Sequence, residues 1–232
     1  MVKRFYKNVT VEQSEVGFKV LCDGKSLKCG GSQDLIVPNL ALAEMLAAEW
    51  DTQDEEIDIK QMHVTDFLTG LNSLDESGRA KLVADSVAFI DTDVLFYRAP
   101  YPASLTERQN SHWDKVLIWA GSKYGISFAV TDSISPLRQS ERTVYALSHA
   151  IESLGDFELL CFYKFSSLTT SVLLGLSVIN KELSAEQAFR LSRLDEDFQN
   201  EFWGKDETAA KATNMNLNDM LITEKIFTAG KQ

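Results

Sequence analysis

The first forty residues alternate apolar and polar positions, which is the pattern of β-strands that bury one face. Phe18, Val20 and Cys22 alternate up to the pair Asp23-Gly24, and the alternation resumes at Leu27. Aspartate followed by glycine tolerates the positive φ angles of a two-residue turn. The sequence therefore predicts a β-hairpin that turns at Asp23-Gly24.

Beyond residue 38 the apolar period lengthens to that of a helix. Ala43, Leu46, Ala47 and Trp50 recur at positions i, i+3, i+4 and i+7, so they form one stripe of an amphipathic helix. Trp50 is accordingly interpreted as a core residue. A second helix is expected over His63–Leu74, and the polar stretch 75–79 that follows predicts a boundary between two domains, 1–75 and 76–232.

The remainder of the chain has mainly helical patterns. Ser171 and Gly175 are small residues within the apolar run Ser167–Ile179. Small side chains allow neighbouring helices to approach closely, so this run predicts a central buried helix. The fold class expected is α+β, with a small β-rich N-terminal domain followed by a mainly helical C-terminal domain.

Local signals predict where further elements begin and end. Ser135-Pro136 pairs a capping serine with a proline, which favours a helix start. Residues 126–130 alternate and predict one short strand. Ser184 and Gln187 have capping-box spacing and predict the start of a long helix that ends at Gly204.

Composition narrows the classes of partner. The 232 residues include 34 acidic and 23 basic ones, giving a formal net charge of −11. A nucleic acid or an anionic membrane requires a basic face, so neither is expected as a partner. No apolar stretch is long enough to span a membrane, so membrane insertion is not expected. The three cysteines, Cys22, Cys29 and Cys161, form no metal-type pair and are interpreted as free thiols of a reducing compartment.

Motifs for catalysis and for metal binding are not found. The chain has no Gly-x-Ser-x-Gly, and His63, His112 and His149 share no motif. Asp91 and Asp93 have the opening rhythm of a calcium loop, but apolar residues follow where ligands are required. No enzymatic activity, cofactor or metal is therefore expected. A small-molecule enzyme with a spatially assembled site is the alternative; a deep pocket enclosing His112 or His149 beside a carboxylate of shifted pKa would favour it.

The segment from Arg193 to Gly204 has an unusual composition. Four carboxylates lie within two helical turns beside large aromatic side chains; the carboxylates are Asp195, Glu196, Asp197 and Glu201, and the aromatics are Phe198, Phe202 and Trp203. Such a segment could dock a basic, partly apolar protein partner. It could equally be a core-facing aromatic stripe with a solvated acidic face. Spacing alone leaves both interpretations open.

Several short motifs occur in a specific order along the chain. They are Arg4–Lys7, Cys22–Lys25, Leu42-Ala43, Ala48–Gln53, Thr92-Asp93, Tyr97–Ala99, His112–Asp114 with Trp119, Asp195–Gln199 and Trp203–Glu207. In this order the chain resembles, from about Arg4 to about Thr208, the assembly-chaperone family that attends the α subunit of the F-type ATP synthase. The chain departs from the family in loops, for example at Cys29-Gly30, where the family usually has Thr-Pro.

The resemblance implies a non-enzymatic holding chaperone. Such a protein would bind the unassembled α subunit and shield its interface until the catalytic head assembles; a permanent structural subunit is the remaining alternative. We expect the partner contacts at Glu196, Gln199, Glu201 and Trp203, because the first three lie away from the apolar stripe of their helix. A monomer is expected, located in the bacterial cytoplasm or, for a processed eukaryotic chain, in the mitochondrial matrix.

Overall fold

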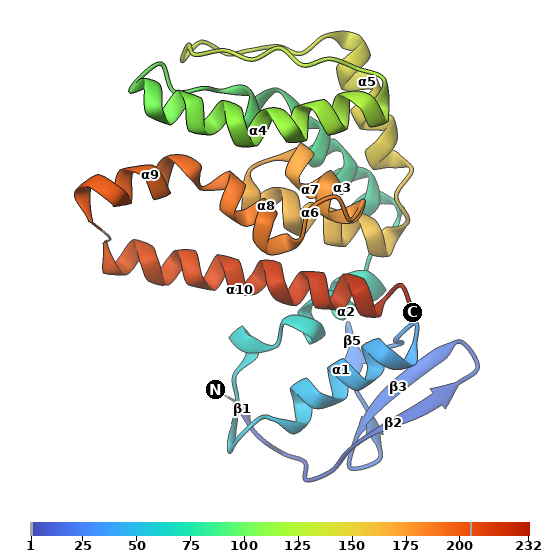
Figure 1. The fold of residues 1–232 in the computed structure, drawn as a ribbon. Coiled ribbons are helices and arrows are strands. Elements are labelled where there is room, and N and C mark those ends of the chain that lie inside the picture. Colours follow the sequence, from blue (N-terminus) through green and yellow to red (C-terminus); the bar gives the residue numbers. More distant parts are fainter. Residues whose placement is uncertain (1, 205) are drawn as a thin grey trace. The chain divides into compact units, whose positions relative to one another are not determined.

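The computed structural model describes residues 2–204 and 206–232 (Figure 1). Contacts within the chain group it into two compact units. Unit 1 runs to Ser77 and also contains Lys225–Gln232, whereas unit 2 is Gly78–Glu224. The predicted domains 1–75 and 76–232 stay a prediction. Lys205, which belongs to the Trp203–Glu207 motif, lies outside the described residues.

Unit 1 combines small antiparallel sheets with helices, as the α+β prediction requires. Its strands are β1 (Val2–Lys3), β2 (Val9–Ser14), β3 (Gly17–Cys22), β4 (Lys25–Ser26), β5 (Lys28–Cys29), β6 (Gln33–Asp34) and β7 (Glu56–Ile57). Its helices are α1 (Leu40–Asp51), the 3-10 turn η1 (Ile59–Gln61) and α2 (His63–Asn72). Strands β2, β3 and β4 form the largest sheet, and β1 pairs with β7 and β5 with β6.

The predicted hairpin turn is confirmed. Cys22 pairs with Lys25 across β3 and β4, so Asp23 and Gly24 alone form the loop. Both have positive φ angles, 48° and 79°. This is the backbone conformation of a two-residue turn that matches the twist of its strands.

Helix α1 packs its apolar stripe on the β2–β3 hairpin (Figure 1). Leu42, Ala43 and Leu46 are buried on this stripe, and Val20 is buried on the sheet side. Trp50, interpreted from the sequence as a core residue, is only half-buried. Trp50 lies in the last turn of α1, where its indole N–H donates to Thr65 Oγ1 of α2 at 2.9 Å.

Unit 2 is helical. Its elements are α3 (Glu76–Ala88, which begins two residues before the unit), η2 (Ile90–Thr92), η3 (Val94–Phe96), α4 (Ala103–Tyr124), α5 (Glu141–Glu152), α6 (Asp156–Thr169), α7 (Val172–Ile179), α8 (Ala185–Ser192), α9 (Leu194–Trp203) and α10 (Glu207–Ala229, which ends in unit 1). Among the described residues, none of the helices combines the length and the apolar character that crossing a bilayer requires.

The predicted central helix is α7, but it begins at Val172 and not at Ser167, because residues 167–169 end α6 and the chain breaks at Thr170 and Ser171. All eight residues of α7 are buried, and the helix contacts α4, α6 and α8. Gly175 makes the close approach to α6 possible, because a Cβ atom there would lie 2.1 Å from Ser166 Oγ and 3.1 Å from the Ser166 backbone nitrogen. Gly175, one of the two small residues that the sequence analysis singled out, therefore sets the α6–α7 spacing, whereas Ser171 caps the start of α7.

Two local predictions in unit 2 are wrong. Helix α5 starts at Glu141, capped by Ser140, and not at Ser135-Pro136. Residues 126–130 form no strand. The Gln139 side chain bonds the backbone N–H and C=O of Ala129, each at 2.9 Å, and Thr131 bridges to Tyr97. These contacts bond the backbone at Ala129 and Thr131 without a strand or a helix.

A buried carboxylate joins the η2–η3 segment to the start of α7. Asp93 Oδ1 accepts a hydrogen bond from the Leu95 N–H at 3.0 Å. Its Oδ2 accepts from Ser171 Oγ at 2.9 Å and from the Leu173 N–H at 3.0 Å. Burial raises the pKa of Asp93 to about 6, against the opposing effect of these hydrogen bonds.

We expect Asp93→Asn to lower the free energy of unfolding by about 1–3 kcal/mol, because in either orientation the amide NH2 would face a backbone N–H donor, that of Leu95 or that of Leu173. In the parent protein, the folded Asp93 retains between about pH 4 and pH 6 a proton that the unfolded chain has released. The contribution of Asp93 to the free energy of unfolding therefore falls as the pH rises through this range, and the variant lacks this pH dependence. Urea unfolding at several pH values measures both effects. The exposed Asp132→Asn is the control, and equal stability of the two variants would contradict the prediction.

Gly175→Ala is expected to destabilise the protein by about 1–3 kcal/mol, since the added methyl group overlaps Ser166. Gly70→Ala is the matched control. Gly70 lies within α2, and no atom lies within 4 Å of the place that an added methyl group would take, so alanine there should stabilise by up to about 1 kcal/mol. Thermal and urea unfolding compare the pair. A stable Gly175→Ala variant would mean that α6 and α7 are not held at this spacing.

Candidate functional site

The acidic and aromatic segment forms its own short helix, α9, where the sequence predicts one long helix from Ser184 to Gly204. Ser184 and Gln187 form the predicted capping box at the start of α8. The helix breaks at Arg193, whose φ and ψ angles are −114° and 17°. The predicted end is confirmed, because Gly204 has φ 80° and follows the last residue of α9.

Side chains of α4 hold α9 in place. Gln109 Nε2 donates to Asp195 Oδ1 at 2.6 Å, and Trp113 Nε1 donates to the Leu191 carbonyl at 2.8 Å, just before α9. The Arg108 guanidinium forms two hydrogen bonds with Glu201, of 2.6 and 2.9 Å, and lies over the Phe198 ring. Arg108 holds the pKa of Glu201 below its usual range. These contacts orient α9 along its whole length.

The four expected contact residues lie on this one helix, and all of them are exposed: Glu196, Gln199, Glu201 and Trp203. Phe198 is the buried residue of α9, so the aromatics do not form a single core-facing stripe. Trp203 is 88% exposed and the adjacent Phe202 68%. The structure therefore presents acidic and aromatic side chains to solvent, as the docking interpretation requires.

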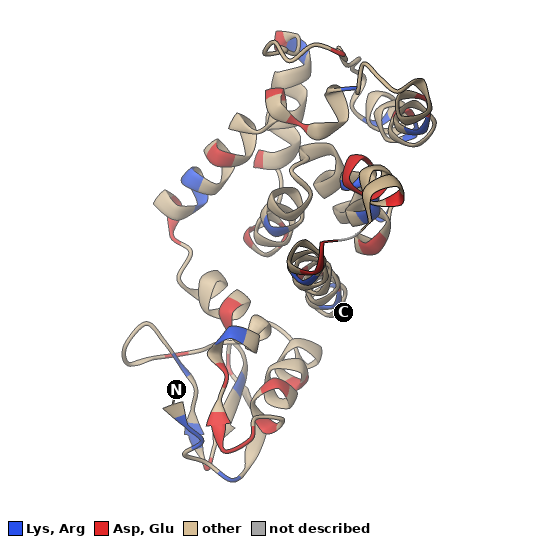
Figure 2. Ribbon diagram, turned by 90° about the vertical axis from the view of Figure 1, so that its left-hand side faces the viewer, with Lys and Arg blue, Asp and Glu red and all other residues tan. Residues whose placement is uncertain are grey.

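We call Glu196, Gln199, Glu201, Phe202 and Trp203 the α9 surface. Figure 2 shows acidic residues along α9, close to its connection with α10. Carboxylates attract lysine and arginine, and an exposed indole offers a large apolar contact area. The carboxylates lie on one helix and not across a cleft, which suits the binding of a protein and does not suit acid–base catalysis.

Glu201 already has a partner within the chain, which sequence reasoning missed. Arg108 is 93 residues away in the sequence, and no local pattern connects the two positions. Glu196 Oε1 lies 3.7 Å from a guanidinium nitrogen of Arg193, three residues earlier in the chain. A partner that uses Glu201 must therefore compete with an internal arginine.

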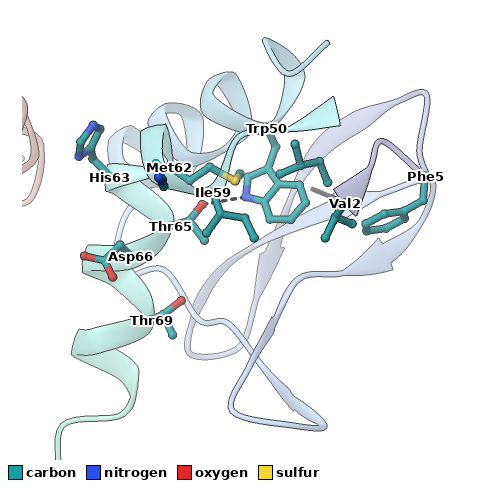
Figure 3. A pocket seen from close by; sticks show the side chains of 11 residues that line it. Val2, Phe5, Trp50, Ile59, Met62, His63, Thr65, Asp66 and Thr69 are labelled. Carbon is teal, nitrogen blue, oxygen red and sulfur yellow. Dashed lines mark hydrogen bonds between the residues drawn. The ribbon is translucent and has the colours of Figure 1, made fainter. Parts of the chain in front are cut away.

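A pocket of about 430 Å³ in unit 1 is a second feature that the sequence did not indicate (Figure 3). The Trp50 indole lies in the middle of its lining, beside Ile59 and Val2. Phe5 lies at one end, and His63 with Asp66 lies at the other. We call this the Trp50 pocket; its remaining lining residues are Ile57, Lys60, Met62, Thr65 and Thr69.

Hydrogen bonds fix the wall of the Trp50 pocket. Trp50 Nε1 donates to Thr65 Oγ1 at 2.9 Å, and Thr65 Oγ1 donates to Glu49 Oε2 at 2.6 Å. Glu49 also accepts from the backbone N–H groups of Val64 and Thr65, at 2.7 and 2.8 Å, so it caps α2 from α1. The Tyr6 hydroxyl donates to the Trp50 carbonyl at 2.6 Å. The pocket is therefore preformed.

These contacts give no support to the alternative of an enzyme. The Trp50 pocket includes His63 but neither His112 nor His149. The carboxyl with the strongly raised pKa, Asp93, is bonded to Ser171 and to the α7 backbone inside the core, where a substrate cannot reach it. In the described part of the chain, no three histidine, cysteine or carboxylate side chains gather as a metal ion would require.

Comparison with known proteins adds independent findings. The family model described as "ATP12 chaperone protein" matches residues 3–121. The mitochondrial protein atp12 of Schizosaccharomyces pombe is 22% identical over 97% of this chain and 81% of its own length.

Solved bacterial structures have the same fold over nearly the whole chain. The crystal structure of Atp12 from Paracoccus denitrificans has a TM-score of 0.91 and 31% identity, and the match covers 99% of this chain and 98% of that one. A structure from Agrobacterium tumefaciens has the same TM-score with 33% identity, over 98% and 85% of the two chains. The chain therefore belongs to the ATP12 chaperone family, a family of ATP synthase assembly chaperones.

Proposed function

We propose that this protein binds the unassembled α subunit of the F-type ATP synthase and shields its subunit interface until the catalytic head assembles. The exposed α9 surface is the observation that carries the proposal. A protein that exposes a tryptophan to 88% beside several carboxylates offers an anchor for a basic, partly apolar partner. Membership of a chaperone family for ATP synthase assembly supports a client from that complex.

The chemistry of the α9 surface suits temporary binding. An unassembled subunit exposes interface-sized apolar area, which promotes aggregation. The chaperone must cover this area and later give way to the β subunit. A contact built from a few aromatics and exposed charges is weaker than a large apolar interface, and screening by salt weakens it further. Holding and release then need no catalytic step.

We further propose that the protein acts as a monomer and forms a one-to-one complex with the α subunit. Its place of action is the compartment where α is made or imported, which is the cytoplasm of a bacterium or the mitochondrial matrix. The excess of acidic residues, 34 against 23 basic ones, supports a client with a basic surface and opposes self-association through α9.

Co-expression with the α subunit of the same source tests the proposal. We expect α to stay soluble and to copurify in equal amount, and added β subunit to release it, because β competes for the same interface. The β subunit co-expressed without α is the control and should not be retained. Failure of α to copurify or to gain solubility would contradict the proposed function.

A pair of variants tests the role of Glu201. Glu201→Lys should weaken α binding at least tenfold with unchanged circular dichroism, since Glu201 is exposed. Arg108→Gln removes the internal partner of Glu201 while Gln109 and Trp113 still hold α9 on α4, so it should leave binding unchanged or strengthen it. Glu15→Lys, at an exposed position in unit 1, controls for the change in net charge.

Comparing the two variants distinguishes a direct contact between Glu201 and the client from a role of Glu201 in holding α9 on α4. If Glu201 only holds α9 on α4, both Glu201→Lys and Arg108→Gln weaken binding alike, and the contact role fails. Calorimetric titration of α with each variant gives the affinities. Equal affinity of Glu201→Lys and the parent protein would exclude Glu201 from the interface.

A further inference from the structure

Two sequence motifs that α9 does not explain meet at the Trp50 pocket. Phe5 and Tyr6 belong to the Arg4–Lys7 motif, and Glu49 with Trp50 belongs to the Ala48–Gln53 motif. Phe5 and Trp50 line the pocket, whereas Tyr6 and Glu49 position its wall through the Trp50 carbonyl and through Thr65.

The Arg4 side chain ties the two motifs together. It donates to the Asp51 carbonyl at 3.0 Å and also to the Gln53 carbonyl, and its guanidinium lies 3.4 Å from the Asp51 carboxylate. The N-terminal segment is thereby fixed beside the end of α1. Both motifs build one preformed cavity.

The rim of this pocket leaves large apolar side chains in water. Val2, Phe5 and Ile59 are 47%, 68% and 67% exposed. They are three of the five large apolar residues that the described part of unit 1 exposes; the other two are Val16 and Leu40. Because the exposed apolar area gathers around one cavity, it indicates a site that an apolar group covers.

An acidic surface continues from the apolar one. Ile57, Ile59 and Lys60 line both the Trp50 pocket and an adjoining shallow depression. The carboxylates of that depression are Asp54, Glu55, Glu56 and Asp58, all of them exposed, and Asp66 lies in the pocket itself. Among the described residues, Lys60 is the one lysine or arginine that lines either cavity, and Lys3 pairs with Glu56 across β1 and β7. A ligand that fills both must combine an apolar group with positive charge.

We propose that the Trp50 pocket and the acidic loop 54–58 bind a short segment of client polypeptide that carries a large apolar side chain next to lysine or arginine. The apolar side chain enters between Trp50 and Ile59, and the basic side chains lie against Glu55 and Glu56. This assignment rests on the proposed function, since it makes unit 1 a second contact with the client. An extended segment fits the site better than a compact metabolite, because two adjoining open cavities combine an apolar lining with several carboxylates.

A dye-labelled peptide, Gly-Ser-Lys-Leu-Phe-Arg-Lys-Ser-Gly, serves as the probe, and fluorescence anisotropy measures its binding. One control peptide replaces its three basic residues with glutamate, and a second replaces leucine and phenylalanine with serine. We expect both controls to bind at least tenfold more weakly than the probe. Equal binding of all three peptides would overturn the proposal.

Variants of the chaperone locate the site. Ile59→Asp should reduce the affinity for the probe at least tenfold, although the added carboxylate alone would attract a basic peptide. Val16→Asp adds the same charge at a position that is 75% exposed and outside the pocket, so its affinity should stay within twofold of the parent protein. Glu55→Lys should weaken binding at least threefold at low salt and less at high salt. Equal affinities of Ile59→Asp and Val16→Asp would overturn the proposal.

Copurification of the α subunit with Ile59→Asp separates this proposal from the proposed function. If α copurifies with the parent protein while Ile59→Asp alters neither peptide binding nor α recovery, the pocket proposal fails and the function stands. If peptide binding depends on Ile59 but α never copurifies, the pocket proposal stands and the choice of α as client fails. The proposal would also be overturned if the parent protein retained a small molecule, or formed a dimer, and Ile59→Asp abolished that binding or that dimer.

Discussion

The attachment of α9 to α4 is the constraint on which the exposed α9 surface depends. A ten-residue helix is too short to persist alone in water, and Asp197 and Glu201 repel each other one turn apart. Phe198 is its buried residue. Gln109 and Arg108 of α4 supply the missing support through hydrogen bonds to α9, and Trp113 of α4 bonds the Leu191 carbonyl near the end of α8. The α9 surface is therefore only as well ordered as its contact with α4.

The same attachment limits how strongly α9 binds a client. Arg108 occupies Glu201 in the free protein, so a client arginine or lysine replaces an existing ion pair and does not find a free carboxylate. The net electrostatic gain of such an exchange is small at an exposed site. Strong binding would have to come from the aromatic side chains. A holding chaperone benefits from this balance, because its complex must come apart when another subunit arrives.

Local signals in the sequence predicted the elements whose cause is local. Asp23-Gly24 supplies its own turn conformation, and the run to Ile179 is apolar on every side. The hairpin and the buried helix could therefore be predicted from the sequence. The helix start predicted at Ser135-Pro136 was wrong, because Gln139 and the bridge from Thr131 to Tyr97 hold that segment in an irregular conformation. These are tertiary contacts, and they override local preference.

In the candidate site, too, the features with a local cause could be predicted and those that depend on tertiary contacts could not. Periodicity placed Glu196, Gln199 and Glu201 on the exposed side of their helix, and the structure has them there. The partner of Glu201 lies 93 residues away, and the Trp50 pocket joins residues from three separate segments. Hydrophobic period alone assigned Trp50 to the core. It could not indicate that the indole would end half-buried, held by Thr65, at the wall of a cavity.

The three cysteines make local unfolding of each unit measurable. Cys22, Cys29 and Cys161 are buried and form no disulfide, and two of them lie in unit 1 and one in unit 2. A thiol reagent reaches each sulfur only when the surrounding structure opens, so labelling rates report local unfolding. Mass spectrometry of the labelled peptides can then distinguish opening of the sheet region from opening of the helical core. A client that rigidifies one unit alone would slow the labelling of that unit's thiols and leave the others unchanged.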